Sequence, residues 1–236
     1  MNGSLALNRA LLEAISGEIC CSGVVVCPPA PYLLQAMQLL TGSHVLVGAQ
    51  NVCCYQDGAY TGEVSATMLS DLGCQYVLVG HSERRALFGE SDAEVAAKAV
   101  RVAEAGLCPV ICVGESLSQR EQGIAERVVA AQLMPVLAEL KPGLLHRCVI
   151  AYEPVWAIGS GLVATTDDIE KMHGAIKQVV HRDAACNLPV LYGGSVKADN
   201  AGTVLAVKDV DGVLVGGASL SVESFLTICK VAQQCA

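Results

Sequence analysis

Two side chains able to move protons stand where apolar runs of the chain end. Glu153 follows the run VIAY, and His81 follows the run YVLVG. A carboxylate with apolar neighbours suits a general base, because apolar surroundings favour the uncharged form of the acid. A structural acid paired with a nearby cation explains a lone Glu153 equally well. The residues that follow Glu153 favour the catalytic interpretation.

A segment typical of a hinged lid follows Glu153 directly. A rigid proline and the single tryptophan of the chain stand at its beginning, and glycine residues stand at its end. Segments of this kind close over a bound ligand. We therefore predict a lid that consists of Pro154, Val155, Trp156, Ala157, Ile158, Gly159, Ser160 and Gly161.

The second candidate, His81, stands at the predicted start of a helix, where either His81 or Ser82 is the N-cap. A lone histidine at such a place more often has a structural role. The positive end of a helix disfavours the imidazolium, however, so we expect a neutral ring that can donate a proton to an oxygen atom. We expect Glu83 beside this ring, in an ion-pair network with Arg84 and Arg85.

Two glycine-rich segments, YGGSV at 192–196 and LVGGASL at 214–220, each lie between an apolar run and a predicted helix. Exposed backbone N–H groups in such turns bind phosphate. One such turn is explained equally well by a tight change of direction. Two turns after the last two strands of a barrel match the usual phosphate site of that architecture. The pair therefore predicts a phosphorylated small molecule as the ligand.

The elements that must position these residues recur along the whole chain. Short, β-branched apolar runs are typical of strands buried on both faces. Seven such runs are VVVCPP (24–29), VLVGAQ (45–50), YVLVG (76–80), PVICVG (109–114), VIAYEP (149–154), PVLYGGS (189–195) and GVLVGGA (212–218). Helical character is found between or before them at 4–16, 92–105, 118–140 and 166–182, the last with an N-cap cluster at its start.

This alternation predicts parallel β-structure with right-handed crossovers, either in a doubly wound sheet or in a closed barrel. Polar residues at the strand ends favour the barrel, whose active site lies there. No linker or low-complexity run divides the chain, so we predict one α/β domain over residues 1–236, a (β/α)8 barrel. That barrel needs eight strands, whereas the sequence offers seven and its first helix has no strand before it.

The composition excludes several classes of partner. A formal net charge of −8 argues against non-specific nucleic-acid binding, which needs a basic surface. No apolar run reaches the ~18 residues of a membrane-spanning helix, and residues 1–14 lack the pattern of a signal peptide. The 12 cysteines show no metal-binding spacing, and we interpret them as small buried side chains in a reducing compartment. We therefore expect a cytoplasmic protein that binds neither nucleic acid, nor membranes, nor a metal ion.

Together these features predict an enzyme that transfers a proton next to the carbonyl group of a phosphorylated small molecule. A sugar-phosphate epimerase on a different phosphate-binding barrel is one alternative. The lid after Glu153 and the surroundings of His81 argue against it.

Six segments resemble the triosephosphate isomerase family. They are VGHSERR (79–85), AYEPVWAIGSG (151–161), LYGGSVKADN (191–200), DGVLVGGASL (211–220), GAQNVCCYQDGAYTGEVSATML (48–69) and CPVICVGESLSQRE (108–121). The resemblance runs in order from the start of the chain to its end. It implies a TIM barrel that interconverts dihydroxyacetone phosphate and glyceraldehyde 3-phosphate through an enediolate, in glycolysis and gluconeogenesis, without a cofactor.

The resemblance also implies roles for the matched residues. Glu153 would move the proton between two substrate carbons, and His81 would polarise the carbonyl group. Backbone N–H groups would hold the phosphate at Gly159, Ser195, Gly216 and Gly217. Tyr192 and Ser195 would help to fasten the closed lid. The catalytic pair would be supported by Ser82, Glu83 and Cys112. The loop from Gln50 to Glu63, with Thr61 near its tip, resembles the arm that inserts into the partner subunit of a homodimer.

The chain departs from the family pattern at two places. Leu162 begins the far hinge of the lid, where the family usually has a lysine. The first strand of the family ends in Asn-Trp-Lys-Met-Asn-Gly, whereas this chain opens at Met1-Asn2-Gly3, so the asparagine and the catalytic lysine have no counterpart in it. We therefore expect the natural polypeptide to extend upstream of Met1, which an intact mass equal to residues 1–236 would contradict. The alternative is a truncated, catalytically impaired chain that acts only in binding or assembly.

Overall fold

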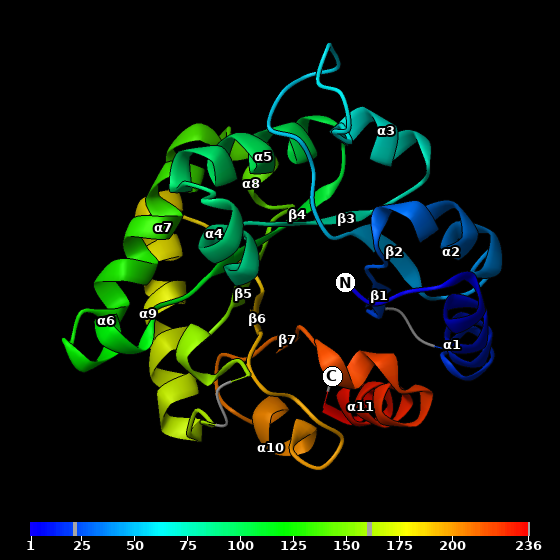
Figure 1. The fold of residues 1–236 in the computed structure, drawn as a ribbon. Coiled ribbons are helices and arrows are strands. Elements are labelled where there is room, and N and C mark those ends of the chain that lie inside the picture. The colour runs from blue at the N-terminus through cyan, green and yellow to red at the C-terminus, as the bar shows by residue number, and fades with distance from the viewer. Residues whose placement is uncertain (21–22, 160–161, 236) are drawn as a thin grey trace.

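One parallel sheet forms the centre of the molecule (Figure 1). The computed structural model describes residues 1–20, 23–159 and 162–235. Its strands follow one another in the sheet in the order of the chain, and every pairing is parallel. They are β1 (Val25–Val26), β2 (Leu46–Ala49), β3 (Tyr76–Val79), β4 (Cys108–Val113), β5 (Val149–Tyr152), β6 (Val190–Tyr192) and β7 (Gly212–Val213). All seven predicted strands are confirmed, each within or close to its apolar run.

Helices lie on the outer side of this curled sheet (Figure 1). They are α1 (Leu5–Glu18), α2 (Leu33–Leu39), α3 (Ala66–Asp71), α4 (Ser82–Phe88), α5 (Asp92–Glu104), α6 (Leu117–Glu121), α7 (Ala125–Glu139), α8 (Pro142–Leu145), α9 (Thr166–Ala184), α10 (Ala201–Leu205) and α11 (Val222–Cys235). Three short 3₁₀ turns are η1 (Ala30–Tyr32), η2 (Val155–Ala157) and η3 (Gly217–Leu220). The architecture is therefore the α/β, TIM-barrel type that the sequence predicts.

Local sequence explains where the helices begin and end. Thr165 is the N-cap of α9, and Asp168 completes the capping box. The polar cluster at the start of this helix predicts such a cap. The sequence predicts a single helix over 118–140, and this is wrong because the structure has two helices there, α6 and α7. Gly123 lies between them with a φ of +69°, a left-handed conformation that glycine adopts easily.

The alternation of side chains along the strands divides the core into two parts. Val77, Ile111 and Ile150 point outward and pack in the large cluster under the helices. Leu78 and Cys112 belong to a smaller inner cluster, which fills the inside of the curled sheet. Burial on both faces explains why the strands appear as continuous apolar runs rather than as alternating ones.

The two outer strands of the sheet are short. Within the described ranges, β1 and β7 each pair with one neighbour, β2 and β6 respectively. Their flanking helices α1 and α11 lie side by side, and Lys230 reaches Glu18 at 2.9 Å. The sheet thus curls toward closure through the contact of its first and last helices.

The carboxyl ends of all strands face one end of the barrel. The glycine, histidine and glutamate residues singled out above follow the last residues of β3, β5, β6 and β7. This is the end where barrels of this type build their active sites. None of the helices in the described part of the chain is both long and apolar enough to cross a membrane.

Candidate active site

Glu153 lies directly after β5 and is buried, with its side chain 3% exposed. Its backbone N–H donates to the carbonyl of Val113 at 2.7 Å, so β4 fixes the start of the lid. A side chain at Gly114 would collide with the Glu153 carbonyl, since its Cβ would lie 1.7 Å from that oxygen. Only glycine therefore lets the end of β4 pass this close to the candidate base.

Two donors hold the Glu153 carboxylate in place. Oε2 accepts from the backbone N–H of Ser82 at 2.8 Å, and Oε1 lies 2.8 Å from Nε2 of His81. The structure thus brings His81 and Glu153, the two residues predicted to do chemistry, within hydrogen-bonding distance. Ser82, which supplies the other donor, lies 71 positions before Glu153 in the chain.

His81 is the N-cap of α4, as one of the two predicted alternatives has it. Its Nδ1 accepts from the backbone N–H of Glu83 at 3.3 Å. A ring nitrogen that accepts from an amide carries no proton, so the proton of the neutral ring lies on Nε2. Nε2–H therefore donates to Glu153 and points into the site.

The charge on Glu153 opposes the expected preference of His81 for the neutral form. Burial, the largest influence, lowers the pKa of His81, but the hydrogen bond to Glu153 and its charge outweigh burial, with a smaller contribution from Glu83. The pKa of His81 is therefore raised from its ordinary value of 6.5. The prediction of a neutral ring considered only the helix N-terminus. It did not include the Glu153 carboxylate, which lies far from His81 in the sequence and next to it in the structure.

The three predicted supporting residues lie at different depths. Ser82 is buried and contributes its backbone N–H to Glu153. Cys112 is fully buried inside the sheet, where burial first and the Glu153 charge second raise the pKa of its thiol. Glu83 is 75% exposed at its side chain and lies 3.9 Å from Nδ1 of His81. Cys112 thus lies inside the sheet within reach of the Glu153 charge, whereas Glu83 borders the site from solvent.

The predicted ion pairs of the VGHSERR segment were assigned to the wrong acid. Arg84 pairs with Glu90, and Arg85 pairs with Asp92 at 2.5 Å. Glu83 precedes both arginines on the first turn of α4, and its ionic contact is with His81 instead. Neither Glu90 nor Asp92 was singled out, because their approach depends on how the chain turns at Gly89 after α4.

The first half of the predicted lid is anchored by a buried acid. Trp156, on η2, donates from Nε1 to Oε1 of Glu115 at 2.7 Å. The hydroxyl of Tyr152 donates to the same oxygen at 3.1 Å. Arg120 lies 3.3 Å from Glu115 and stacks over the Trp156 ring at 4.4 Å. Glu115 is fully buried, and the sequence analysis gives it no role, although a polar residue just after a buried strand is the signal that could have found it.

The remaining lid residues follow η2 onto the surface. Pro154 and Ala157 are buried, Val155 is half-buried, and Ile158 and Gly159 are exposed. Ser160 and Gly161 lie outside the described residues. The exposed stretch therefore begins two residues beyond the anchored tryptophan.

Ser195 ties the lid to the end of β6. Its hydroxyl donates to the carbonyl of Ala157 at 3.0 Å. A cavity of about 400 Å³ lies beside this contact, and it is lined by Leu162, Val163, Ser195, Lys197, Asp199 and Asn200. The hydroxyl contact and the cavity place Ser195 between the lid and the end of β6, and its role in phosphate binding stays a prediction.

Among the described residues, no hydrogen bond joins Tyr192 to the lid, and its role in fastening the closed lid stays a prediction. It is 1% exposed, and its ring lies against the rings of Tyr152 and His173. A Cβ at Gly194 would lie 2.2 Å from the Tyr192 hydroxyl, so glycine is needed for the turn to pass over the ring. Tyr192 therefore supports the turn from beneath.

The second glycine turn lies after β7. Gly216 and Gly217 are exposed and open η3, with nothing within 4 Å of a Cβ built on either residue. Their backbone N–H groups are accessible to an anion. No group of three or more His, Cys, Asp or Glu side chains suited to a metal ion gathers in the described ranges.

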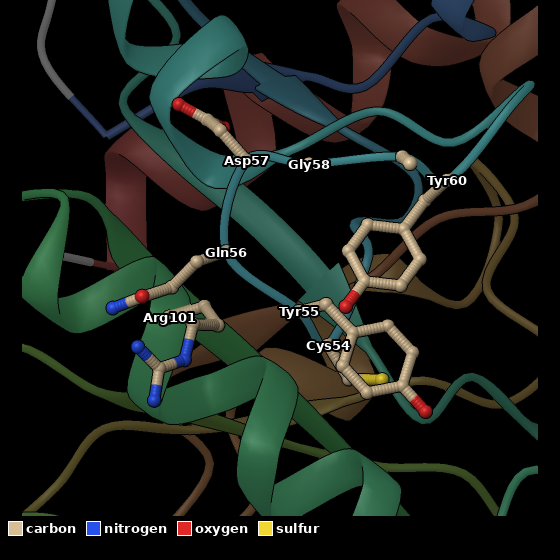
Figure 2. A pocket seen from close by; sticks show the side chains of 8 residues that line it. Cys54, Tyr55, Gln56, Asp57, Gly58, Tyr60 and Arg101 are labelled. Carbon is tan, nitrogen blue, oxygen red and sulfur yellow. The ribbon is translucent and has the colours of Figure 1, made fainter.

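The predicted arm projects beyond the helices, between β2 and α3 (Figure 1). Within it, the rings of Tyr55 and Tyr60 stack 4.6 Å apart (Figure 2). A cavity of about 580 Å³ lies between the arm and Arg101 of α5. Thr61, near the tip, is exposed. The arm is thus a preformed projection with an apolar pair on it.

Comparison with known proteins gives one consistent result. The profile of the family described as triosephosphate isomerase matches residues 1–232. The triosephosphate isomerase of Cupriavidus necator is 53% identical over 231 residues, which cover 97% of this chain and 94% of that protein. Those of Thiobacillus denitrificans and Alcanivorax borkumensis are 52% and 45% identical, and the matches cover 98% and 99% of this chain and 95% of each relative.

Proposed function

The chain belongs to the triosephosphate isomerase family, and from this membership we propose how its site carries out the reaction. The protein is an isomerase that interconverts dihydroxyacetone phosphate and glyceraldehyde 3-phosphate. The identity extends over nearly the whole chain and does not favour the alternative of an inactive binding chain.

Glu153 is the base of the proposed mechanism. It takes a proton from C1 of dihydroxyacetone phosphate, which leaves an enediolate, and it returns a proton to C2. The O2 atom gains a proton while the O1 hydroxyl loses one, so the aldehyde forms without net change in composition. A glutamate base beside a neutral histidine is the well-known arrangement of this enzyme family, so the pairing itself is expected. The observation that carries the assignment is the 2.8 Å contact between buried Glu153 and Nε2 of His81.

His81 polarises the substrate carbonyl in this mechanism. Its Nε2–H, now directed at Glu153, turns to the carbonyl oxygen when the substrate enters between them. The Glu83 amide on Nδ1 keeps the proton on the nitrogen that faces the site. A hydrogen bond to an oxygen that gains negative charge stabilises the enediolate more than the ground state.

The lid and the glycine turns hold the phosphate group. Backbone N–H groups of Gly159, Ser195, Gly216 and Gly217 would donate to its oxygens, supported by the exposure of both Gly216 and Gly217. Closure of the lid over the bound substrate would exclude water from the enediolate.

We also propose a homodimer. The arm from Gln50 to Glu63 would insert into a second copy. Exposed apolar side chains on the arm (Tyr55 and Tyr60), on α3 (Met68) and at the end of α4 (Leu87 and Phe88) support this. A cytoplasmic location is proposed as well, because each of the eleven cysteines in the described ranges is a free thiol.

Isomerase turnover with glyceraldehyde 3-phosphate tests this proposal. We expect turnover by the unaltered protein, and a loss of about 10²- to 10⁴-fold in Glu153→Gln, because general-base catalysis of this kind contributes that much. Glu139→Gln, an exposed change on α7, is the matched control and should leave turnover unchanged. Equal activity in Glu153→Gln and Glu139→Gln would overturn the assignment of the base.

A further inference from the structure

The hydrogen-bond ladder between β3 and β4 stops where β3 leaves the sheet. Its last paired residues are Val79 and Ile111. The next carbonyl on each strand, that of Gly80 and that of Cys112, accepts from the same side chain. Nε of Arg85 donates to Gly80 at 2.8 Å, and Nη2 donates to Cys112 at 3.2 Å. One guanidinium thus joins the two strands beyond the end of their ladder.

Arg85 is held firmly in this position. Its third contact is the pair with Asp92 at 2.5 Å, and its side chain is 16% exposed. Gly80 has a φ of +69°, and a Cβ there would lie 2.7 Å from Val95 and 3.0 Å from Nη2 of Arg85. The planar fork of arginine satisfies three acceptors in fixed directions, which a lysine ammonium cannot reproduce.

Both strands that Arg85 joins lead into the reacting pair. Gly80 is followed by His81, whose carbonyl accepts the backbone N–H of Arg85 at 3.1 Å. On the other side, the residue after Cys112 is Val113, whose carbonyl accepts from the N–H of Glu153. The guanidinium thus acts through the two strand ends, from beneath the site.

We infer that Arg85 is a positioning residue for the isomerase reaction, which fixes the His81 imidazole at hydrogen-bonding distance from Glu153 and from the substrate carbonyl. The inference rests on the proposed role of His81. A displacement of about 1 Å in a catalytic group lowers rates by up to about 10²-fold, so a clamp on the strand end controls turnover without touching the substrate.

Arg85→Lys is the first test. We expect kcat to fall about 10- to 100-fold while KM changes less than about threefold, because the phosphate-binding turns lie on other strands. Asp92→Asn is a milder second variant, which leaves Arg85 in place but removes the charge that orients it, and it should lower kcat about 3- to 10-fold. Arg182→Lys, at a site 68% exposed on α9, is the matched control and should match the unaltered protein.

An NMR measurement separates this inference from the proposed function. In protein labelled with ¹⁵N-histidine, the signals of His81 are assigned by their loss in His81→Gln. We expect Arg85→Lys to change the Nε2–H signal that reports the contact with Glu153, whether or not the protein turns over substrate. An inactive unaltered protein would overturn the proposed function, whereas an unchanged His81 signal in Arg85→Lys would overturn the clamp.

The kinetic result also has a contrary outcome. If Arg85→Lys and Asp92→Asn lose activity only in proportion to the fraction of unfolded protein, measured by circular dichroism under assay conditions, Arg85 is a stabilising residue and the inference is wrong.

Discussion

The reacting pair is assembled by donors that the local sequence does not reveal. Glu153 and His81 could be singled out because each follows an apolar run, and a polar residue at a strand end is exposed to the site. Ser82, by contrast, acts through its backbone N–H, and Glu115 acts through a tryptophan 41 residues away. Contacts of this kind depend on the packing of distant strands, so no spacing in the sequence predicts them.

The pKa of His81 gives a prediction at the scale of single residues. Removal of the carboxylate in Glu153→Gln takes away the main influences that raise this pKa and leaves burial, which lowers it. We expect the pKa of His81 to fall relative to the unaltered protein, as measured by NMR titration of the imidazole signals. A pKa that stays the same or rises would contradict the assigned cause.

His173 predicts how stability depends on pH. It is fully buried, Nδ1 lies 3.1 Å from the carbonyl of Asp209, and Nε2 has no partner in the described part of the chain. Burial lowers its pKa from 6.5 to about 4. Between these values the unfolded chain binds a proton that the folded chain does not, so the free energy of unfolding is highest above pH 6.5 and falls as the pH drops toward 4.

The measurement is urea unfolding at pH 7.5 and at pH 5. We expect the loss of stability between them to be smaller in His173→Gln, by up to about 2 kcal/mol, since one pKa unit corresponds to about 1.4 kcal/mol. His146→Gln, at an exposed histidine, serves as the control. An identical pH dependence in His173→Gln and in the unaltered protein would show that this ring does not titrate on unfolding.

At the scale of elements, strands were easier to predict than the ends of helices. Burial on both faces makes the strands visible as apolar runs, so all seven were found. Except for β4, the strands are shorter than the runs because the chain leaves the sheet near glycines and prolines such as Gly80 and Pro154. The sequence pattern misses the break between α6 and α7 because the polar stretch 118–122 is itself helical, and only Gly123 separates it from the apolar spacing of α7.

The anchored half of the lid gives the prediction at this scale. Trp156→Phe keeps an aromatic ring but removes the hydrogen bond to Glu115, and hydrogen bonds to charged groups contribute about 1.5–3 kcal/mol. We expect kcat/KM to fall about tenfold, because the lid base loses its fixed orientation. Steady-state kinetics measure this, with Phe225→Leu on α11 as a control away from the lid. Unchanged kinetics in Trp156→Phe would mean that this bond does not govern the lid.

At the scale of the whole molecule, the strands follow one another around the barrel in the same order as along the chain. The sequence predicts this because strand and helix alternate, and the strand order β1 to β7 confirms it. The single domain over residues 1–236 stays a prediction. Assembly could not be predicted from the residues themselves, since an exposed loop appears alike in a monomer and in a dimer.

The arm gives the prediction for assembly. Tyr60→Asp places a charge beside Tyr55 on the proposed contact surface, where the two rings now stack (Figure 2). We expect the mass in sedimentation equilibrium to shift from dimer toward monomer, because an unpaired charge buried in an interface is costly. Gln122→Asp, exposed at the end of α6, is the control and should remain dimeric. A monomer in the unaltered protein would contradict the proposed homodimer.

The most direct test of the central claim follows the proton that Glu153 moves. The protein converts dihydroxyacetone phosphate in D₂O, with the product trapped as it forms, and NMR measures deuterium at C2 of glyceraldehyde 3-phosphate. We predict that part of the product carries deuterium there, since the proton on the base exchanges with solvent before it returns, and that Glu153→Gln forms product and label about 10²- to 10⁴-fold more slowly. Product without any deuterium at C2, or label formed equally fast by Glu153→Gln, would contradict proton transfer by this residue.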